Sequence, residues 1–409
     1  MLVVGAGVAG TAAALAAARA GAQVSVLDGG TGASTLTTGA IDANLWPRAP
    51  TRPAPIAAAT HDTLRSLGGY TLPDAGARLL TQSGMVRPAR GHDDALIDIK
   101  PFASVRVGVV RCERPGWDAD ALARAWGEGF EPLDALVMRY ADERMLPDPD
   151  FAMRHDDEAR LGWLAERLRD ALARTGHGIR AVVLPSCLGV EYPRAQTLSE
   201  RVGVRCGEAI ASPGGPSGLR FEGARDRALA DAGIERVQAR ATGVDRKGNV
   251  WRVATDSTAD RFLEADAVVL ATGGLIGGGI DYSPAESIFA SALPPFARRP
   301  FRLTVDAPAV LGAHGAPLEL PSTLFGSPPE SVVWPGLDDS LMDCVGVLAD
   351  ADGRTESGLF AAGDLRADRP RAWLDVLATG AAAGAAAAKT ALNASAATQV
   401  PAEGPPIRP

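Results

Sequence analysis

The pattern of apolar and polar positions predicts strands that alternate with helices. An apolar run at residues 1–4 precedes a small-residue segment at 8–20, and a second apolar run follows at 23–27. A further unbroken apolar run lies at 265–272, and an Ala/Gly-rich segment begins near residue 380. Short unbroken apolar runs separated by helices are typical of buried parallel strands. We therefore predict an α/β fold with a Rossmann-like parallel sheet.

The middle of the chain carries elements of its own. A strand is expected at 180–185, and segments 234–242 and 250–255 predict a β-hairpin that turns at 245–248. Four leucines recur at helical spacing beside Asp and Arg, which predicts an amphipathic helix. They are Leu161, Leu164, Leu168 and Leu172.

Composition narrows the class of protein. Of the 409 residues, 46% are hydrophobic and 22% are charged, as in a globular protein. Lys+Arg 41 against Asp+Glu 49 gives a net charge of −8, which offers no electrostatic case for binding nucleic acid or anionic lipid. The four cysteines form no CxxC pair, so no metal or iron–sulfur site is expected. No long apolar stretch is present either, and we predict a cytoplasmic protein.

The first chemical signal is a glycine-rich turn. Gly5, Gly7 and Gly10 follow the first predicted strand and open the first predicted helix. The second strand runs into Asp28, roughly 20 residues later, where a dinucleotide site needs a carboxylate for the ribose hydroxyls. The glycines let the backbone approach a pyrophosphate at the helix N-terminus. A glycine-rich turn without a ligand is the alternative, and this motif alone does not separate NAD from FAD.

Later segments select the flavin. The strand at 265–272 ends in Ala-Thr-Gly, and another predicted strand ends in Gly-Asp, which suits the ribityl hydroxyls of a flavin. A Thr-Gly pair further on is expected to open a helix whose N-terminal amides face the flavin ring. An NAD-only dehydrogenase has no use for these later segments, so FAD is predicted. The predicted cofactor residues here are Ala271, Thr272, Gly273, Gly363, Asp364, Thr379 and Gly380.

These segments predict a discontinuous FAD-binding domain with an inserted α+β lobe. FAD is expected to be non-covalent, because residues 29–60 offer neither His nor Cys for attachment. The predicted ranges are 1–45, 235–290 and 336–395 for the FAD-binding domain, 46–234 for an inserted substrate or partner lobe, 291–335 for an irregular surface segment, and 396–409 for a tail.

Beyond the flavin segments, the chain resembles the B-type subunit of the anaerobic glycerol-3-phosphate dehydrogenase. Residues 33–42 resemble a Ser/Gly-rich segment of that family, 183–189 its Met-Pro-Ala-Cys-Phe-Gly loop, and 211–220 its Pro-Pro-Ser-Val-Leu-Gly-Ile-Arg segment. The likeness spans most of the chain. It fails at 379–382, where the family has Gly-Gly-Gly, and over 295–335, which leaves the substrate open. From its first segment the resemblance adds Ser34, Thr38 and Gly39 to the cofactor set.

The resemblance implies a complex. In it a sister flavoprotein subunit oxidises glycerol 3-phosphate to dihydroxyacetone phosphate, and a membrane-anchoring Fe–S subunit passes the electrons to quinone. The same resemblance implies attachment at the inner face of the cell membrane through these partners. The family is described as carrying FMN, whereas Asp28 and the pyrophosphate glycines suit the adenosine half that FMN lacks. We therefore favour FAD, with FMN as the family alternative.

No catalytic residue is predicted, since none of the five histidines lies beside a recognisable partner. Cys187 is expected to be either a reactive thiol or a buried apolar residue. Guanidinium groups bind phosphate or carboxylate bidentately, so arginines form a candidate substrate site, with a solvated arginine face as the alternative. These arginines are Arg220, Arg298, Arg299 and Arg302.

Three functions stay open at this point. The first is an FAD-dependent dehydrogenase subunit of the glycerol-3-phosphate type that is active only in its complex. The second is a stand-alone flavoprotein of the fumarate-reductase or succinate-dehydrogenase type, acting on another small substrate. The third is a structural subunit without turnover.

Overall fold

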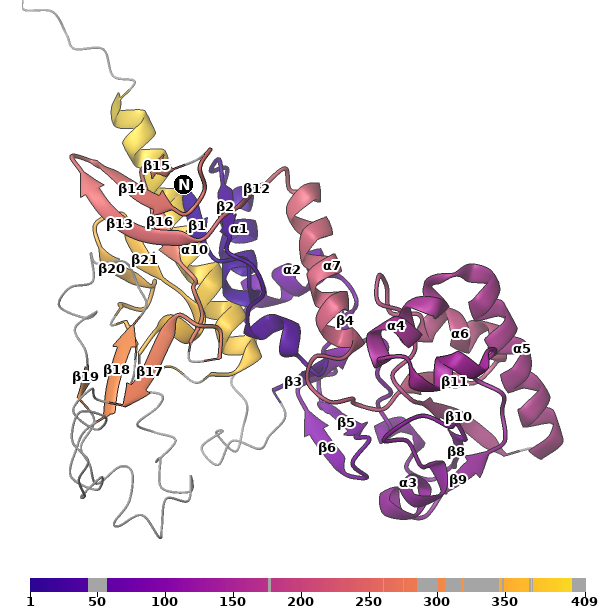
Figure 1. Ribbon diagram of the computed structural model, residues 1–409. Coiled ribbons are helices and arrows are strands. Elements are labelled where there is room, and N and C mark those ends of the chain that lie inside the picture. Colours follow the sequence, from indigo (N-terminus) through magenta and orange to yellow (C-terminus); the bar gives the residue numbers. More distant parts are fainter. Residues whose placement is uncertain are drawn as a thin grey trace, which may run out of the picture. The chain divides into compact units, whose positions relative to one another are not determined.

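The chain divides into two compact units, and each is described here by itself (Figure 1). Unit 1 comprises residues 1–33, 57–63 and 229–409, and unit 2 comprises residues 34–56 and 64–228. The computed structural model describes residues 1–42, 57–175, 178–259, 261–274, 276–284, 301–305, 318–319, 346–347, 349–367, 369 and 371–398.

Unit 1 is built on a six-stranded sheet, which confirms the predicted Rossmann-like α/β class. Strand β1 pairs in parallel with β2 on one side and with β16 on the other, so that Val3 lies opposite both Val26 and Val269. These three valines are fully buried because the sheet is covered on both faces. In order across the sheet, the strands are β12 (Glu235–Gln238), β2 (Ser25–Asp28), β1 (Leu2–Val4), β16 (Val268–Leu270), β21 (Leu359–Ala361) and the antiparallel β20 (Arg354–Glu356).

Two helices rich in small residues, α1 (Val8–Arg19) and α10 (Trp373–Thr398), pack tightly against each other in unit 1. A Cβ atom at Gly380 would overlap the carbonyl oxygen of Ala9, and one at Gly384 would overlap that of Ala13. The two backbones therefore lie in direct contact, with glycine on α10 packed against alanine on α1. This packing explains much of the alanine and glycine in both segments.

The predicted hairpin after residue 234 is correct only in part. Strand β13 (Ala241–Lys247) does pair with β14 (Val250–Thr255), and β15 (Phe262–Ala265) extends this antiparallel sheet. Residues 235–238, however, form β12 and pair in parallel with β2. The chain leaves the main sheet just after β12, where the Arg240 amide donates to the Asp256 side chain. β12 therefore pairs with the open edge of β2, which lies far away in sequence.

Three further strands of unit 1 form a separate antiparallel sheet: β17 (Ile280–Pro284), β18 (Phe301–Val305) and β19 (Leu318–Glu319). The last two lie inside the segment 291–335, for which an irregular course is predicted. The remaining residues of that segment lie outside the described part of the chain.

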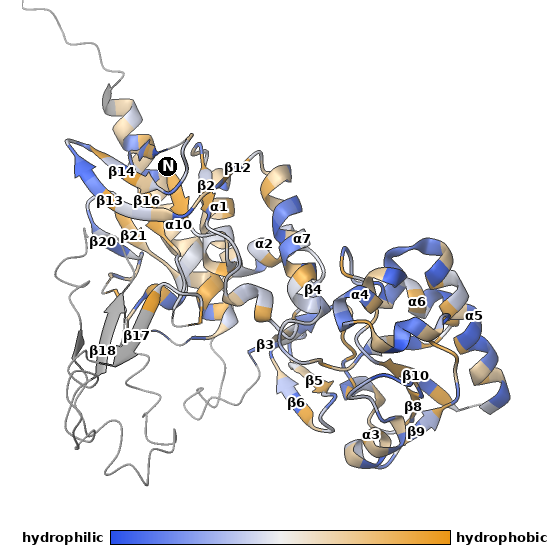
Figure 2. Cartoon of the chain, in the orientation of Figure 1, coloured by the Kyte–Doolittle hydropathy of each residue, from blue (hydrophilic) through white to orange (hydrophobic). Residues whose placement is uncertain are grey.

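Unit 2 contains a parallel sheet of its own. Its order is β9 (Phe130–Leu133), β8 (Arg106–Val110), β10 (Ile179–Leu184) and β11 (Arg205–Glu208). Helices α3 (Ala119–Trp126), α5 (Glu158–Thr175) and α6 (Ala195–Val202) connect these strands in turn. The predicted amphipathic helix is confirmed as α5, whose leucines 161, 164 and 168 are fully buried while Figure 2 shows hydrophilic residues on its other face.

Shorter elements complete unit 2. Small antiparallel sheets pair β5 with β6, and β7 with both β3 and β4, and helix α7 follows the parallel sheet. The bounds are β3 (Ala40–Ile41), β4 (Tyr70–Thr71), β5 (Ala77–Leu80), β6 (Val86–Ala89), β7 (Gly91–Asp93), α4 (Asp148–Met153) and α7 (Pro216–Asp231); α2 (Ala58–Leu67) and α7 each cross a unit boundary. None of the described helices is long and apolar enough to cross a membrane.

Candidate cofactor site

The first glycine loop lies where β1 meets α1, as predicted. Gly5 has φ +107°, a conformation that favours glycine, and a Cβ atom there would overlap the carbonyl oxygen of Ala271. A Cβ atom at Gly10 would likewise overlap the carbonyl oxygen of Gly5. Gly7 is the N-cap residue of α1 and brings no capping side chain. The loop therefore presents backbone, rather than side chains, at the positive end of a helix dipole, which suits a pyrophosphate.

Asp28 is the last residue of β2 and is largely buried. Its carboxylate accepts hydrogen bonds from the Gly30 amide at 3.0 Å and from Gln238 Nε2 at 3.2 Å, and Arg236 Nε lies 3.7 Å away. These neighbours hold the carboxylate at the end of the strand. A carboxylate in this place can accept the hydroxyls of an adenosine ribose.

The Ala-Thr-Gly segment ends strand β16. The Ala271 amide donates to Val4 O at 2.8 Å, and Gly273 has φ +89°, so the chain turns sharply just past the sheet. The Thr272 hydroxyl is buried and has no hydrogen-bond partner among the described residues. A buried hydroxyl without a partner costs about 1–3 kcal/mol, so this one fits a bound ligand that supplies the missing hydrogen bond.

The Gly-Asp segment ends strand β21 and packs onto the first loop. Gly363 has φ +68°, and a Cβ atom there would come within 2.6 Å of Ala9 Cβ. Asp364 follows in a short 3-10 turn, Gly363–Leu365. Arg371 Nη1 donates to the Asp364 carbonyl oxygen at 2.9 Å, which places a cation beside this turn. Arg371 is a candidate cofactor residue that the sequence analysis missed, because a lone arginine after a Gly-Asp pair belongs to no motif.

The prediction that Thr379 and Gly380 open a helix is wrong. Helix α10 begins at Trp373, because the buried Leu374 and Leu377 extend its apolar face by almost two turns. The Thr379 hydroxyl instead accepts the Gly363 amide at 3.1 Å, and Gly380 packs against α1. Thr379 therefore supports the Gly-Asp turn, and Gly380 lies against the helix that follows the glycine loop. Neither residue belongs to the first turn of α10.

All of these strand ends meet at one edge of the parallel sheet. The Gly5 amide donates to Leu27 O, the Ala271 amide to Val4 O, and the Ala362 amide to Leu270 O, at 2.8 to 2.9 Å. Each bond joins the end of one strand to the end of its neighbour. Ligands of open parallel sheets bind at this carboxyl edge, so the segments predicted separately from sequence lie together at a candidate cofactor site.

Three other predicted cofactor residues, Ser34, Thr38 and Gly39, belong to unit 2. Gly39 has φ +84°, and a Cβ atom there would press on Ser217 Oγ at 2.7 Å. Packing within unit 2 therefore accounts for the glycine at position 39. The cofactor roles of all three residues stay predictions.

Of the predicted substrate arginines, Arg220 is committed to an internal ion-pair network. It is buried in α7, four residues after the helix begins, where it donates to Asp93 Oδ2 at 2.6 Å and to Glu208 Oε2 at 2.8 Å. Arg298 and Arg299 lie outside the described residues, and only the backbone of Arg302, in β18, is described. A joint phosphate site of these arginines stays a prediction.

Two of the candidate reactive groups, Cys187 and His155, are buried in unit 2. Burial raises the pKa of the Cys187 thiol well above its ordinary value, so this residue is a buried thiol and not a reactive thiolate. His155 is also buried, and its burial together with the nearby Arg160 guanidinium lowers its pKa to about 3. His177 and His314 lie outside the described residues. Within the described ranges, no group of three or more His, Cys, Asp or Glu side chains could hold a metal ion.

Comparison with known proteins agrees with the cofactor. Residues 1–154 match the model of a family described as an FAD binding domain. A search of curated protein sequences gives no match. The cofactor of this chain is FAD, which confirms the prediction made from the glycine loop, Asp28 and the later flavin segments together.

Three solved structures align with most of this chain at low sequence identity. An oxidoreductase from Agrobacterium tumefaciens is 12% identical with a TM-score of 0.34, over 96% of this chain and 98% of that one. A thioredoxin reductase from Gloeobacter violaceus is 14% identical with a TM-score of 0.32, over 100% and 97%. A glycine oxidase from Geobacillus kaustophilus is 14% identical with a TM-score of 0.33, over 93% and 91%.

Proposed function

We propose that this chain is an FAD-dependent oxidoreductase that works as the B-type subunit of an anaerobic glycerol-3-phosphate dehydrogenase complex. The observation that carries the oxidoreductase part is the meeting of three glycine-rich strand ends and Asp28 at one edge of the unit 1 sheet. The resemblance of residues 33–42, 183–189 and 211–220 to the family of that subunit supports the finer assignment. Glycerol 3-phosphate is the substrate of the complex, and dihydroxyacetone phosphate is its product.

The residues of the site divide the work of holding the cofactor. Gly5, Gly7 and Gly10 let backbone amides approach the pyrophosphate, and Asp28 accepts the ribose hydroxyls. Thr272 donates or accepts one hydrogen bond at the next strand end, and Arg371 holds a positive charge beside the Gly-Asp turn. Bound FAD supplies two-electron acceptor chemistry. The described residues of unit 1 thus bind and orient the cofactor.

A relay role within a complex fits the side chains better than independent turnover. Among the described histidines, His92 and His155 are buried in unit 2, and His61 is exposed on α2. None of them belongs to the segments that end the strands of the unit 1 sheet, so those described segments bring no histidine as a proton acceptor. A relay needs only a held cofactor and neighbouring redox partners, which the resemblance supplies as a sister flavoprotein and an Fe–S subunit.

The test is dye reduction by the isolated chain with glycerol 3-phosphate, repeated after the sister subunit is added. We expect little turnover alone and full turnover in the reconstituted complex. Turnover on the order of 10 s⁻¹ without any partner contradicts the relay role. Asp28→Asn, assayed in the complex, should lose cofactor and turnover while the subunits still assemble. Asp245→Asn is the exposed control and should keep cofactor, turnover and assembly.

A further inference from the structure

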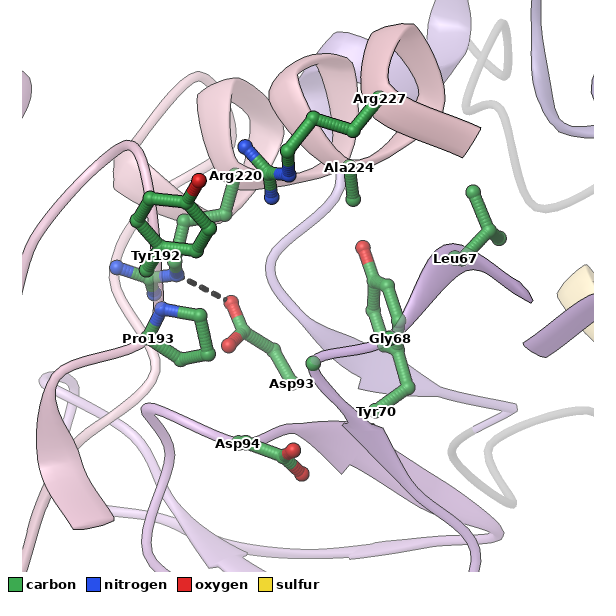
Figure 3. Close-up of a pocket in the computed structure, with 11 residues that line it drawn as sticks. Leu67, Gly68, Tyr70, Asp93, Asp94, Tyr192, Pro193, Arg220, Ala224 and Arg227 are labelled. Atoms are coloured by element: carbon green, nitrogen blue, oxygen red, sulfur yellow. Dashed lines mark hydrogen bonds and ion pairs between the residues drawn. The ribbon is translucent and has the colours of Figure 1, made fainter. Parts of the chain in front are cut away.

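Unit 2 contains a pocket of about 330 Å³, which is the size of a small metabolite site (Figure 3). One wall is a single face of α7, on which Arg220, Ala224 and Arg227 follow at helical spacing. The opposite walls come from strand β4 with the turn before it, and from the Tyr192-Pro193 segment. All of its lining residues belong to unit 2, whereas the strand ends of the candidate cofactor site belong to unit 1.

Arg220 and Asp93, which both line the pocket, belong to a buried ion network. Arg220 bridges Asp93 and Glu208, and it also donates to Gly189 O at 2.6 Å. The three charged side chains are at most 3% exposed. Removing one member leaves a buried charge uncompensated, which costs several kcal/mol, so this network fixes the pocket wall. Arg220 is therefore a structural residue, because four of its five N–H donors are used by Asp93, Glu208, Gly189 O and Ser217 Oγ.

Arg227 is the cation that remains available. It makes no ion pair or hydrogen bond within the part of the chain that the structure describes. Its guanidinium instead stacks on the Tyr192 ring, 4.2 Å from the centroid. Such stacking fixes the plane of the guanidinium while its N–H groups stay open to an acceptor. Figure 3 shows this group below α7, on the pocket side of the helix.

Two polar side chains complete the lining. Asp94 accepts a hydrogen bond from Thr71 Oγ1 at 2.6 Å, and burial raises the pKa of its carboxyl group. The pKa of Tyr70 is also raised, chiefly by burial and then by Asp93, so its phenol keeps its proton. The pocket lining thus combines the Arg227 guanidinium with the carboxyl group of Asp94 and the hydroxyl group of Tyr70.

We propose that this pocket binds a small molecule that joins an anionic head, phosphate or carboxylate, to a hydroxyl or ammonium group a few atoms away. Arg227 binds the anionic head with two parallel hydrogen bonds, and Asp94 accepts from the donor group. The apolar edges of Leu67 and Ala224 limit the ligand to a short carbon chain. A site of this kind in the unit that carries no predicted pyrophosphate loop would serve for substrate capture or for regulation.

Calorimetric titration of the full chain with four probes tests this proposal. sn-Glycerol 3-phosphate joins a phosphate to hydroxyls, and L-serine joins a carboxylate to an ammonium group. Inorganic phosphate carries only the anionic feature, and glycerol carries only hydroxyls. We expect at least one of the first two to bind, and both single-feature probes to bind at least about tenfold more weakly. The stronger of the first two identifies the source of the anionic head.

Variants assign the binding to the pocket. Arg227→Gln should raise the Kd of the preferred probe by about tenfold or more, and Arg227→Lys should recover part of the loss. Arg124→Gln is the matched control, because it removes the same charge from the exposed face of α3. An unchanged Kd in Arg227→Gln, or no binding of either two-feature probe at 10 mM, on the order of the weakest useful metabolite affinity, overturns the proposal. FAD content of each variant is measured in parallel, so that failure of this site is distinguished from failure of the proposed function.

Discussion

Replacing Gly384 with alanine should destabilise unit 1, although the same change stabilises most helices. A Cβ atom at this position would lie 2.6 Å from both the carbonyl carbon and the Cα of Ala13, and closer still to the Ala13 carbonyl oxygen. Carbon atoms pack best at about 3.5–4.0 Å, so the two helices must separate by about 1 Å. All of the atoms that block the new methyl group belong to the backbone of α1, and no rotamer change relieves the overlap.

The magnitude follows from two opposing effects. Glycine to alanine gains about 1 kcal/mol of helix propensity, whereas overpacking a tight interface costs about 1–3 kcal/mol and more when backbone must move. The expected balance is a loss of about 1–2 kcal/mol. For a unit of this size that lowers the Tm by roughly 2–8 °C. Because α1 carries the glycine loop, we also expect weaker FAD retention in the variant.

Differential scanning calorimetry with and without added FAD measures both effects. Gly162→Ala in α5 is the matched control, since a Cβ atom there meets only the end of the Arg201 side chain at 3.5 Å and the propensity gain stands alone. Ala385→Gln on the exposed face of α10 controls for added bulk on the same helix. If Gly384→Ala raised the Tm as Gly162→Ala is expected to do, the close approach of α1 and α10 would be refuted.

Two further predictions concern single carboxyl and imidazole groups. Asp28→Ala should weaken FAD binding by about 1.5–3 kcal/mol, because a charged hydrogen-bond acceptor is lost. Equilibrium dialysis against FAD measures the change, with Asp245→Ala as the control. Retained FAD occupancy in Asp28→Ala contradicts the assignment. His155 has a pKa of about 3 in the folded state, below its ordinary value of 6.5, so the unfolded state binds the extra proton and stability falls as the pH falls from 6.5 towards 3. As the pH falls from 6.5 to 4.5, the free energy of unfolding of His155→Phe should decrease by about 2–3 kcal/mol less than that of the unchanged chain, as measured by urea unfolding. His61→Gln replaces an exposed histidine and should leave this pH dependence unchanged. Equal pH slopes for all three proteins would show that His155 is not held neutral.

The cofactor segments could be predicted from the sequence because their signals are local. Gly5, Gly7 and Gly10 stand at fixed spacing between a strand and a helix, and positive φ at such turns is a property of glycine itself. Parallel strands end at one edge, so the order of the motifs was enough to bring Asp28 and Gly363 to the same site.

The errors have a common cause in contacts between distant residues. The start of α10 depends on what Leu374 and Leu377 bury, which no capping signal near Thr379 reveals. Strand β12 joins the main sheet because β2, about two hundred residues earlier, leaves an edge open. Arg220 looked like a phosphate ligand because its partner Asp93 lies 127 residues away. Arg227, the available cation of that helix face, carried no signal that set it apart from its neighbours.

The packing of α1 against α10 also fixes the order in which the chain can fold during synthesis. β1 and α1 are synthesised before unit 2, yet their partners β16, β21 and α10 lie after residue 267. The strands and helices of unit 2, by contrast, are all available once residue 231 has emerged. Domains generally fold as units during translation, so unit 2 completes its core first while β1, α1 and β2 still lack β16 and α10. The nascent β1–α1 segment therefore exposes apolar surface until α10 has been made, and slowing translation before α10 should increase aggregation of the chain.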